Sequence, residues 1–173
     1  SLMSMAKAIP THRFLGVEVH RPGVGKCLSE LARFDLDNVQ VYCHDAVDVL
    51  RDCIKDHDLD CIQIFFPDPW PKKRHHKRRL IQTDFIRALL PKLSKTGRLH
   101  LATDWAPYAE HMLDVLSHTE GLHNVAGVNQ FHPKPKTRPL TKFEARGQGL
   151  GHEVFDLIFT LDPCIDPPLD VQP

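Results

Sequence analysis

The sequence predicts an α/β domain built around a mostly parallel sheet, and three observations lead to that class. Short apolar runs of strand length recur along the chain, amphipathic helical patterns lie between them, and most runs end at a proline or a carboxylate. At 173 residues the chain is long enough to bury the core of one such domain and too short for two. We expect this domain to cover residues 1–161 and a flexible, proline-rich tail to cover residues 162–173.

Each predicted strand is a short apolar run bounded by polar residues or prolines. The first begins at Phe14, the third stops at Pro67, and the fourth stops at Thr103. The predicted strands are residues 14–19, 39–43, 59–66, 99–102 and 153–161. After Gly121 the alternation fails, and a segment rich in proline and lysine, residues 132–140, predicts an ordered loop.

Each predicted helix repeats apolar residues at intervals of three and four. The longest pattern runs over residues 79–93, has its apolar side chains on one face and ends before Gly97. Asp104 is expected to cap the helix after the fourth strand, which has Pro107 in its first turn. The other predicted helices are residues 1–8, 25–34 and 46–56.

The composition excludes several classes of protein. The 22 Lys and Arg balance the 22 Asp and Glu, so any affinity for nucleic acid must come from where the cations lie. The five cysteines form no C-x-x-C pair, which indicates neither a disulfide framework nor a zinc site, and we expect no metal. Neither a run of about 18 apolar residues nor a signal segment is visible, so we expect a cytoplasmic protein without membrane contact.

Carboxylates follow four of the predicted strands, at Glu18, Asp45, Asp68 and Asp104. Ligands of open α/β sheets bind outside the carboxyl ends of the strands, so these side chains are expected to form one acidic rim. A ligand with hydroxyls, amines or positive charge would suit such a rim, and S-adenosylmethionine has all three. Glu18 suits the ribose hydroxyls and Asp45 the adenine amine. The plainer alternative for any one of them is a helix cap.

The segment Phe65-Phe66-Pro67-Asp68-Pro69-Trp70 follows the third strand. Its prolines restrict themselves and the residues before them, so Asp68 is held in a backbone of little freedom. A carboxylate and an aromatic side chain held at a sheet edge are what the binding of a nucleic-acid base requires. The alternative is a rigid turn in which Trp70 packs on the core.

A dense basic run follows at once, and six of its eight residues are permanently cationic: Lys72, Lys73, Arg74, His75, His76, Lys77, Arg78 and Arg79. Such density repels itself unless an anion is near, and phosphates are the expected anion. A solvated helix start would place these cations against the helix dipole, although basic runs also serve as localisation signals.

A later segment places a hydroxyl, a cation, an aromatic ring and a carboxylate in adjacent positions, as functional loops do. These residues are Thr141, Lys142, Phe143 and Glu144. An ordinary surface hairpin is the alternative.

Together these segments resemble the bacterial tRNA (guanine-N7)-methyltransferase family. The matching residues are 16–20, 22–25, 65–70, 102–105 and 138–144, in the order of the family. The resemblance implies a Rossmann-like methyltransferase fold with helices on both faces of the sheet and an antiparallel C-terminal strand.

The resemblance also implies roles for single residues. Glu18 and Asp45 bind S-adenosylmethionine, and Asp68 is the carboxylate of the catalytic site, also near the cofactor. The substrate, guanine 46 of the tRNA variable loop, is contacted by Lys72, Asp104 and Thr141 to Glu144. The tRNA backbone is contacted by the residues from Arg74 to Arg79.

One departure from the family concerns the start of the chain. Residues 1–6 resemble the helix that follows the family's glycine-rich cofactor loop, so the first strand and that loop are expected to belong to a longer protein. Two other functions stay open: a catalytically inactive RNA-binding subunit, and an amino-methyltransferase that acts on an exocyclic base amine. The single proline between Asp68 and Trp70 disfavours the second.

Overall fold

The computed structural model describes residues 2–141, 144 and 153–161. They fall into two compact units. The first holds the residues up to Ile54 together with 137–140, and the second holds residues 55–136 and the described residues from Thr141 onward. Helices and strands alternate along the chain, which confirms the predicted α/β class.

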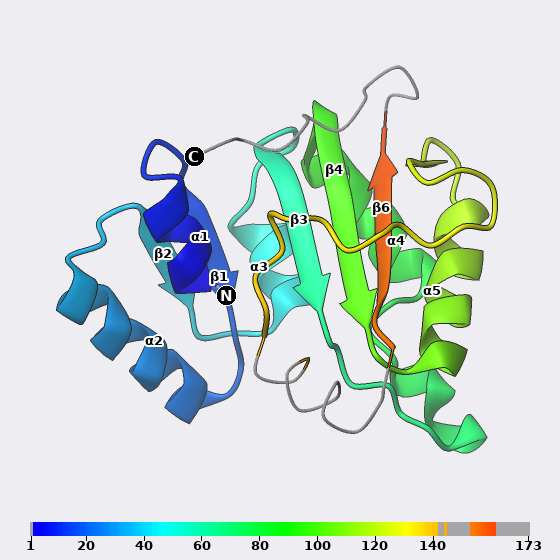
Figure 1. Cartoon of the computed structure of the whole chain (residues 1–173), viewed down its shortest axis with the longest axis horizontal. Helices are drawn as coiled ribbons and strands as arrows, with labels where there is room; N and C mark the ends of the chain where they lie inside the picture. Colours follow the sequence, from blue (N-terminus) through cyan, green and yellow to red (C-terminus); the bar gives the residue numbers. More distant parts are fainter. Residues whose placement is uncertain (1, 142–143, 145–152, 162–173) are drawn as a thin grey trace. The chain divides into compact units, whose positions relative to one another are not determined.

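The first unit contains a pair of parallel strands and three helices. In chain order these are α1 (Leu2–Ala8), β1 (Phe14–Val17), α2 (Arg21–Phe34), β2 (Val39–Tyr42) and α3 (Ala46–Asp52). Phe14 pairs with Val39, and α1 and α2 contact the strands (Figure 1). A Cβ at Gly16 would lie 2.7 Å from Leu2 Cδ2, so glycine lets α1 approach β1 closely.

Two helix boundaries in this unit differ from the prediction. The second helix begins at Arg21 rather than at Gly25, because Pro22 lies in its first turn, where a missing N–H costs nothing. The third ends at Asp52 rather than at residue 56.

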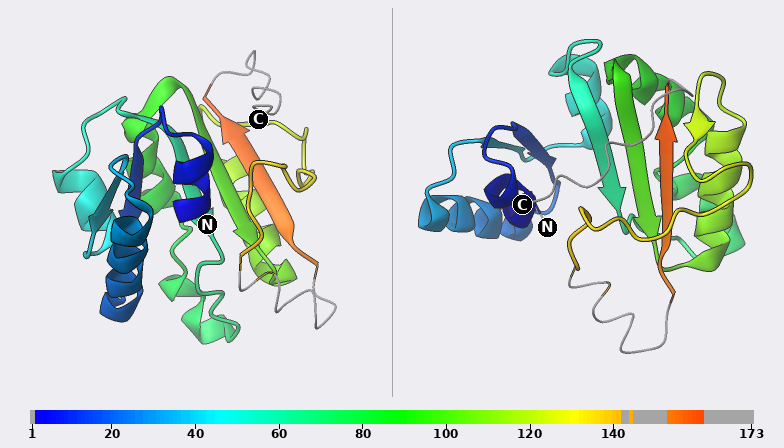
Figure 2. Two further views of the ribbon diagram at one scale, coloured as in Figure 1. Left: turned by 60° about the vertical axis from the view of Figure 1, so that its left-hand side comes forward. Right: turned by 45° about the horizontal axis from the view of Figure 1, so that its top comes forward.

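The second unit is a four-stranded mixed sheet with strand order β3-β4-β6-β5. Its elements are β3 (Leu59–Phe65), the 3-10 helix η1 (Lys73–Arg78), α4 (Thr83–Leu89), the 3-10 helix η2 (Leu90–Lys92), β4 (Leu93–Thr103), α5 (Ala106–Ser117), β5 (His123–Asn124) and β6 (Phe155–Thr160). β3 and β4 are parallel, and β6 runs against β4, which confirms the antiparallel C-terminal strand (Figures 1 and 2). α5 contacts β4 and β6, with α4 beside it.

The helix predicted over residues 79–93 is wrong at both ends. Residues 79–82 precede α4 without helical structure, and Gln82 has an extended backbone. Pro91 lies within η2, and Leu93 already begins β4. Leu93, the last apolar residue of the predicted helix, lies instead in β4, where it pairs with Leu59 of β3.

The fourth strand is longer than predicted and contains Gly97. Its register against β3 shifts between the pairs Leu59↔Leu93 and Cys61↔Arg98, so β4 carries extra residues there. A Cβ at Gly97 would lie 2.8 Å from Ser94 O, which explains the glycine in this irregular stretch.

The core of the second unit lies between the sheet and the helices α4 and α5. Its fully buried side chains include Ile86, Leu89, Leu99, Leu101, Met112, Leu116, Leu157 and Phe159. This rigid layer supports the segments that follow β3 and β4. Among the residues that the structure describes, no helix is long and apolar enough to cross a membrane.

Candidate active site

The segment that carries Asp68 leaves the sheet at the carboxyl end of β3. The amide of Phe66 still pairs with Ala102 O at 2.7 Å, and Asp68 itself is exposed. Phe66 and Trp70 both have left-handed backbones, with φ of 53° and 43°. Bulky residues rarely adopt this conformation, and such strain collects at functional sites. The backbone around Asp68 is therefore more unusual than the prolines alone predict, and its rigidity stays a prediction.

Asp104 follows the neighbouring parallel strand, β4. Because Phe65 pairs with Ala102, Asp68 and Asp104 follow the carboxyl ends of adjacent strands at one edge of the sheet. The predicted capping role of Asp104 is wrong: the N-cap of α5 is Trp105, which has no side-chain cap. Thr103 Oγ1 instead accepts a hydrogen bond from the Trp105 amide at 3.3 Å. Asp104 lies before the helix, on the segment that joins β4 to α5.

Trp70, in the Asp68 segment, contacts two residues of the basic run. The Arg78 guanidinium lies over the Trp70 ring, 5.1 Å from its centre, and the His75 ring meets Trp70 edge-on at 5.8 Å. Two more residues of the run, Arg74 and Lys77, are exposed on η1. At least one of these cations, Arg78, thus contacts the segment that presents Asp68.

The other residues of the run divide by burial. Lys72 is the exposed N-cap of η1, and His76 is half-buried. Arg79, at the other end, is buried with 4% of its surface exposed. Arg79 therefore differs from the exposed cations beside it.

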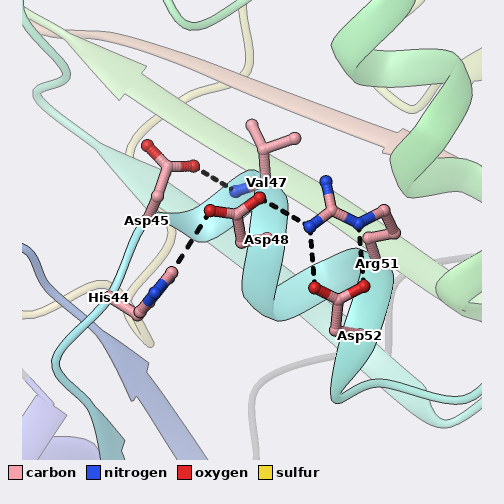
Figure 3. A network of polar contacts seen from close by, with 6 residues as sticks. All are labelled: His44, Asp45, Val47, Asp48, Arg51 and Asp52. Atoms are coloured by element: carbon pink, nitrogen blue, oxygen red, sulfur yellow. Dashed lines mark hydrogen bonds and ion pairs between the residues drawn. The ribbon is translucent and has the colours of Figure 1, made fainter.

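In the first unit Glu18 and Asp45 follow β1 and β2, which are parallel neighbours, so both lie at one edge of that strand pair. Glu18 is exposed, and its Oε1 accepts a hydrogen bond from the His20 amide at 2.9 Å. Asp45 is the N-cap of α3, and its Oδ1 accepts from the Val47 amide at 2.8 Å (Figure 3). The capping alternative is thus realised for Asp45. A carboxylate has two oxygens, so the cap does not preclude a ligand.

A charged network that the sequence reasoning missed follows Asp45 on α3. Arg51 is bonded to Asp52 through two nitrogens at 2.7 Å and reaches Asp48 at 2.8 Å, while His44 lies 3.6 Å from Asp48 (Figure 3). The hydrogen bonds that Arg51 donates, first to Asp52 and then to Asp48, raise the pKa of Arg51. The sequence could have indicated this network, because Asp48 is four positions after His44 and three before Arg51, and residues so spaced are neighbours on a helix. All these groups are at the surface, so the network contributes little stability.

Of the late segment, Thr141 and Glu144 lie within the described residues, while Lys142 and Phe143 lie outside them. Thr141 Oγ1 accepts a hydrogen bond from the Glu144 amide at 3.1 Å. The Glu144 carboxylate is buried, and Lys134 Nζ lies 2.8 Å from its Oε1. Lys134 was not among the predicted site residues. Its place in the segment rich in proline and lysine was the available signal.

Tyr108, on α5, was not among the predicted site residues. Its ring is fully buried, and its hydroxyl accepts a hydrogen bond from the Ile81 amide at 3.2 Å. Burial raises the pKa of Tyr108, and the nearby Asp68 carboxylate adds a smaller effect in the same direction. The charge of Asp68 thus contributes to the raised pKa of Tyr108. Among the described residues no group of three or more histidine, cysteine or acidic side chains could hold a metal ion.

Comparison with known proteins agrees with these features. A family model described as "Putative methyltransferase" matches residues 1–157. The proteins named tRNA (guanine-N(7)-)-methyltransferase in Serratia proteamaculans and Yersinia pestis are both 54% identical to the chain over 159 residues. That stretch is 92% of this chain and 66% of each relative, so the chain spans just under two thirds of their length.

Solved structures share the fold at low identity. Precorrin-6y C5,15-methyltransferase from Geobacter metallireducens has a TM-score of 0.57 and 16% identity, over 90% of this chain and 72% of that one. A "putative methyltransferase" from Streptococcus mutans, solved in complex with SAH, has a TM-score of 0.54 and 10% identity, over 85% of this chain and 74% of that one. At these identities the likeness shows the fold alone, and it confirms the Rossmann-like methyltransferase architecture.

Proposed function

Because the chain belongs to the methyltransferase family whose model spans residues 1–157, we propose that it transfers a methyl group from S-adenosylmethionine to N7 of a guanine in tRNA. By resemblance that guanine is position 46 of the variable loop. The observation that carries the proposal is the strained segment at the end of β3, which presents the exposed Asp68 directly before a basic helix. It is supported by the 54% identity to relatives named for this reaction. The expected cytoplasmic location stays a prediction.

The residues of the first unit fit the adenosine part of the cofactor. Glu18 and Asp45 are exposed carboxylates at one edge of a parallel strand pair, and each has one oxygen in a backbone hydrogen bond. Their oxygens suit ribose hydroxyls and an adenine amine, both of which donate hydrogen bonds. When bound, S-adenosylmethionine supplies a methyl group on a positively charged sulfur.

Guanine N7 has an in-plane lone pair and no proton, so no residue is required to remove one. The work of the protein is then to position the base and to stabilise the positive charge that develops on it. Asp68 suits both tasks, because a carboxylate accepts hydrogen bonds from guanine N1–H and N2–H and attracts a cationic purine. Asp104 follows the adjacent strand, and its carboxylate suits the same substrate.

The exposed cations of η1 suit the phosphates on either side of the target base. Arg74, Lys77 and Arg78 follow Trp70 within eight positions along the chain, and the Arg78 guanidinium also lies over its ring. Phosphate contacts give affinity and register without selecting a base, and this leaves base selection to the Asp68 segment. The neutral net charge of the chain does not oppose tRNA binding, since the cations are concentrated here.

The test uses two tRNAs that differ only at position 7 of one purine ring. The full-length protein is incubated with methyl-labelled S-adenosylmethionine and a tRNA that carries either guanine or 7-deazaguanine at position 46. We expect label only in the guanine tRNA, because 7-deazaguanine has a C–H in place of N7. Equal labelling of both would indicate an exocyclic amine as the target. Binding of both tRNAs without label in either would indicate an inactive RNA-binding subunit.

A further inference from the structure

Arg79 differs in burial from the other cations of the basic run. The four cations before it from Lys73 to Arg78 are exposed, whereas Arg79 has 4% of its surface exposed and directly follows η1. Its Nη2 is buried and has no hydrogen-bond partner among the residues that the structure describes. A guanidinium so enclosed offers little surface to a phosphate. Binding of the tRNA backbone therefore does not explain why Arg79 is buried.

The contacts of Arg79 join the Asp68 segment to helix α5. Its Nε donates a hydrogen bond to the carbonyl of Pro69 at 2.9 Å. Its guanidinium carbon lies 4.7 Å from the centre of the Tyr108 ring, which is fully buried. Tyr108 is held in turn by the hydrogen bond that its hydroxyl accepts from the Ile81 amide. Arg79 thus connects one backbone atom beside Asp68 to a fixed point in the core.

The segment needs such a connection because its backbone is strained. The left-handed residues Phe66 and Trp70 flank Asp68 on both sides, and such a conformation persists only where surrounding contacts enforce it. The Pro69 carbonyl belongs to the peptide bond that joins Pro69, the residue after Asp68, to Trp70. A hydrogen bond to that carbonyl restrains the backbone at the residue next to the carboxylate.

We propose that Arg79 is a positioning residue, which holds Asp68 in its working place through the Pro69 carbonyl and the Tyr108 ring and does not contact tRNA phosphate. This inference rests on the proposed function for the role of Asp68. Lysine should not replace Arg79. The planar guanidinium bonds in its plane while its face lies on a ring, and an ammonium cannot do both in one orientation.

The experiment uses the full-length protein in which phenylalanine replaces every tryptophan except Trp70; within residues 1–173 this is Trp105→Phe alone. In this background Arg79→Lys and Arg79→Gln are compared with Arg74→Ala, from the exposed part of the run, and with Arg87→Lys, an exposed arginine of α4. Four quantities are measured: acrylamide quenching of Trp70 fluorescence, kcat, KM for tRNA, and the dependence of tRNA affinity on salt.

We expect Arg79→Lys to increase quenching of Trp70 and to lower kcat about tenfold to a hundredfold, since displacement of a reacting group by about 1 Å costs roughly that much. The KM for tRNA and the salt dependence should stay near those of the parent. Arg79→Gln keeps a planar group with a donor for the Pro69 carbonyl, which lysine lacks, and should recover part of kcat. Arg74→Ala should lower the salt slope by about one while leaving quenching unchanged, and Arg87→Lys should change nothing.

Three results would overturn the inference. A retained kcat with a smaller salt slope in Arg79→Lys would make Arg79 a phosphate contact. Unchanged Trp70 quenching in both Arg79 variants would show that the segment does not depend on it. Loss of folding in both, seen by circular dichroism, would make Arg79 a core residue only. If the parent methylates no tRNA, the proposed function fails, and the quenching result alone decides whether Arg79 holds the segment.

Discussion

His100 and Asp156 form a buried pair across the antiparallel strands β4 and β6, with 2.7 Å between Nε2 and Oδ1. The Phe65 ring packs against the His100 ring at 4.9 Å, so the pair also contacts β3. The carboxylate only accepts, which makes His100 Nε2–H the donor. The pair therefore ties the C-terminal strand to the strand whose end leads to Asp104.

Asp156→Ala should lower the free energy of unfolding by about 1–3 kcal/mol, because it leaves a buried imidazole N–H without this acceptor. Urea denaturation measures the change. The matched control is Asp114→Ala, which removes the same type of pair at the surface, where Asp114 and His118 lie 3.2 Å apart. The control should change stability little. Equal effects of the two substitutions would show that burial does not matter to the first pair.

Asp68→Ala in the full-length protein should lower methyl transfer about a hundredfold, which corresponds to the loss of one contact made mainly in the transition state. Its affinity for tRNA should stay nearly unchanged, because phosphate contacts supply most of the binding. Single-turnover rates and filter binding measure the two quantities. A variant as active as its parent would remove Asp68 from the mechanism.

Substitution of Arg74, Lys77 and Arg78 by alanine should weaken tRNA binding and flatten its salt dependence. Each lost phosphate contact removes about 0.7 to 0.9 of a released counterion from the slope of log affinity against log salt concentration. Titrations between about 50 and 200 mM salt measure that slope. If the slope equals that of the parent, η1 is not the phosphate footprint.

Asp45 has two candidate roles, which Asp45→Ser should separate. Serine is also a good N-cap, so the hydrogen bond to the Val47 amide and the thermal stability should be kept. The second carboxylate oxygen is lost, so affinity for S-adenosylmethionine should fall. Calorimetry of the full-length protein measures both quantities. A large loss of stability with unchanged cofactor affinity would leave Asp45 as a cap alone.

Tyr108 should make the protein less stable in alkali. Burial raises its pKa in the folded state, while tyrosine in an unfolded chain ionises near pH 10. Above that pH the unfolded chain binds fewer protons than the folded one, so the free energy of unfolding falls as pH rises toward the folded pKa. In Tyr108→Phe this fall should be shallower. Urea denaturation at several pH values from about 8 to 11 tests it, and parallel curves for the two proteins would contradict it.

Local patterns in the sequence determined most of the elements and the order of the functional segments. The strand that begins at Phe14 and the strand that ends at Phe65 are found close to where their apolar runs predict them. The prolines around Asp68 predict a restricted backbone from the sequence alone, because proline limits backbone angles regardless of the rest of the fold.

Only the tertiary structure decided where helix patterns end and which polar groups are buried. Leu93 fits the apolar face of a helix, yet it begins β4 because pairing with β3 outweighs a weak helix preference. Arg79 belongs by sequence to an exposed basic run, yet its guanidinium lies buried between Pro69 and Tyr108. Tyr108 follows Arg79 by 29 positions, and no local pattern can show that two such residues meet, because their contact depends on how α5 packs on the sheet.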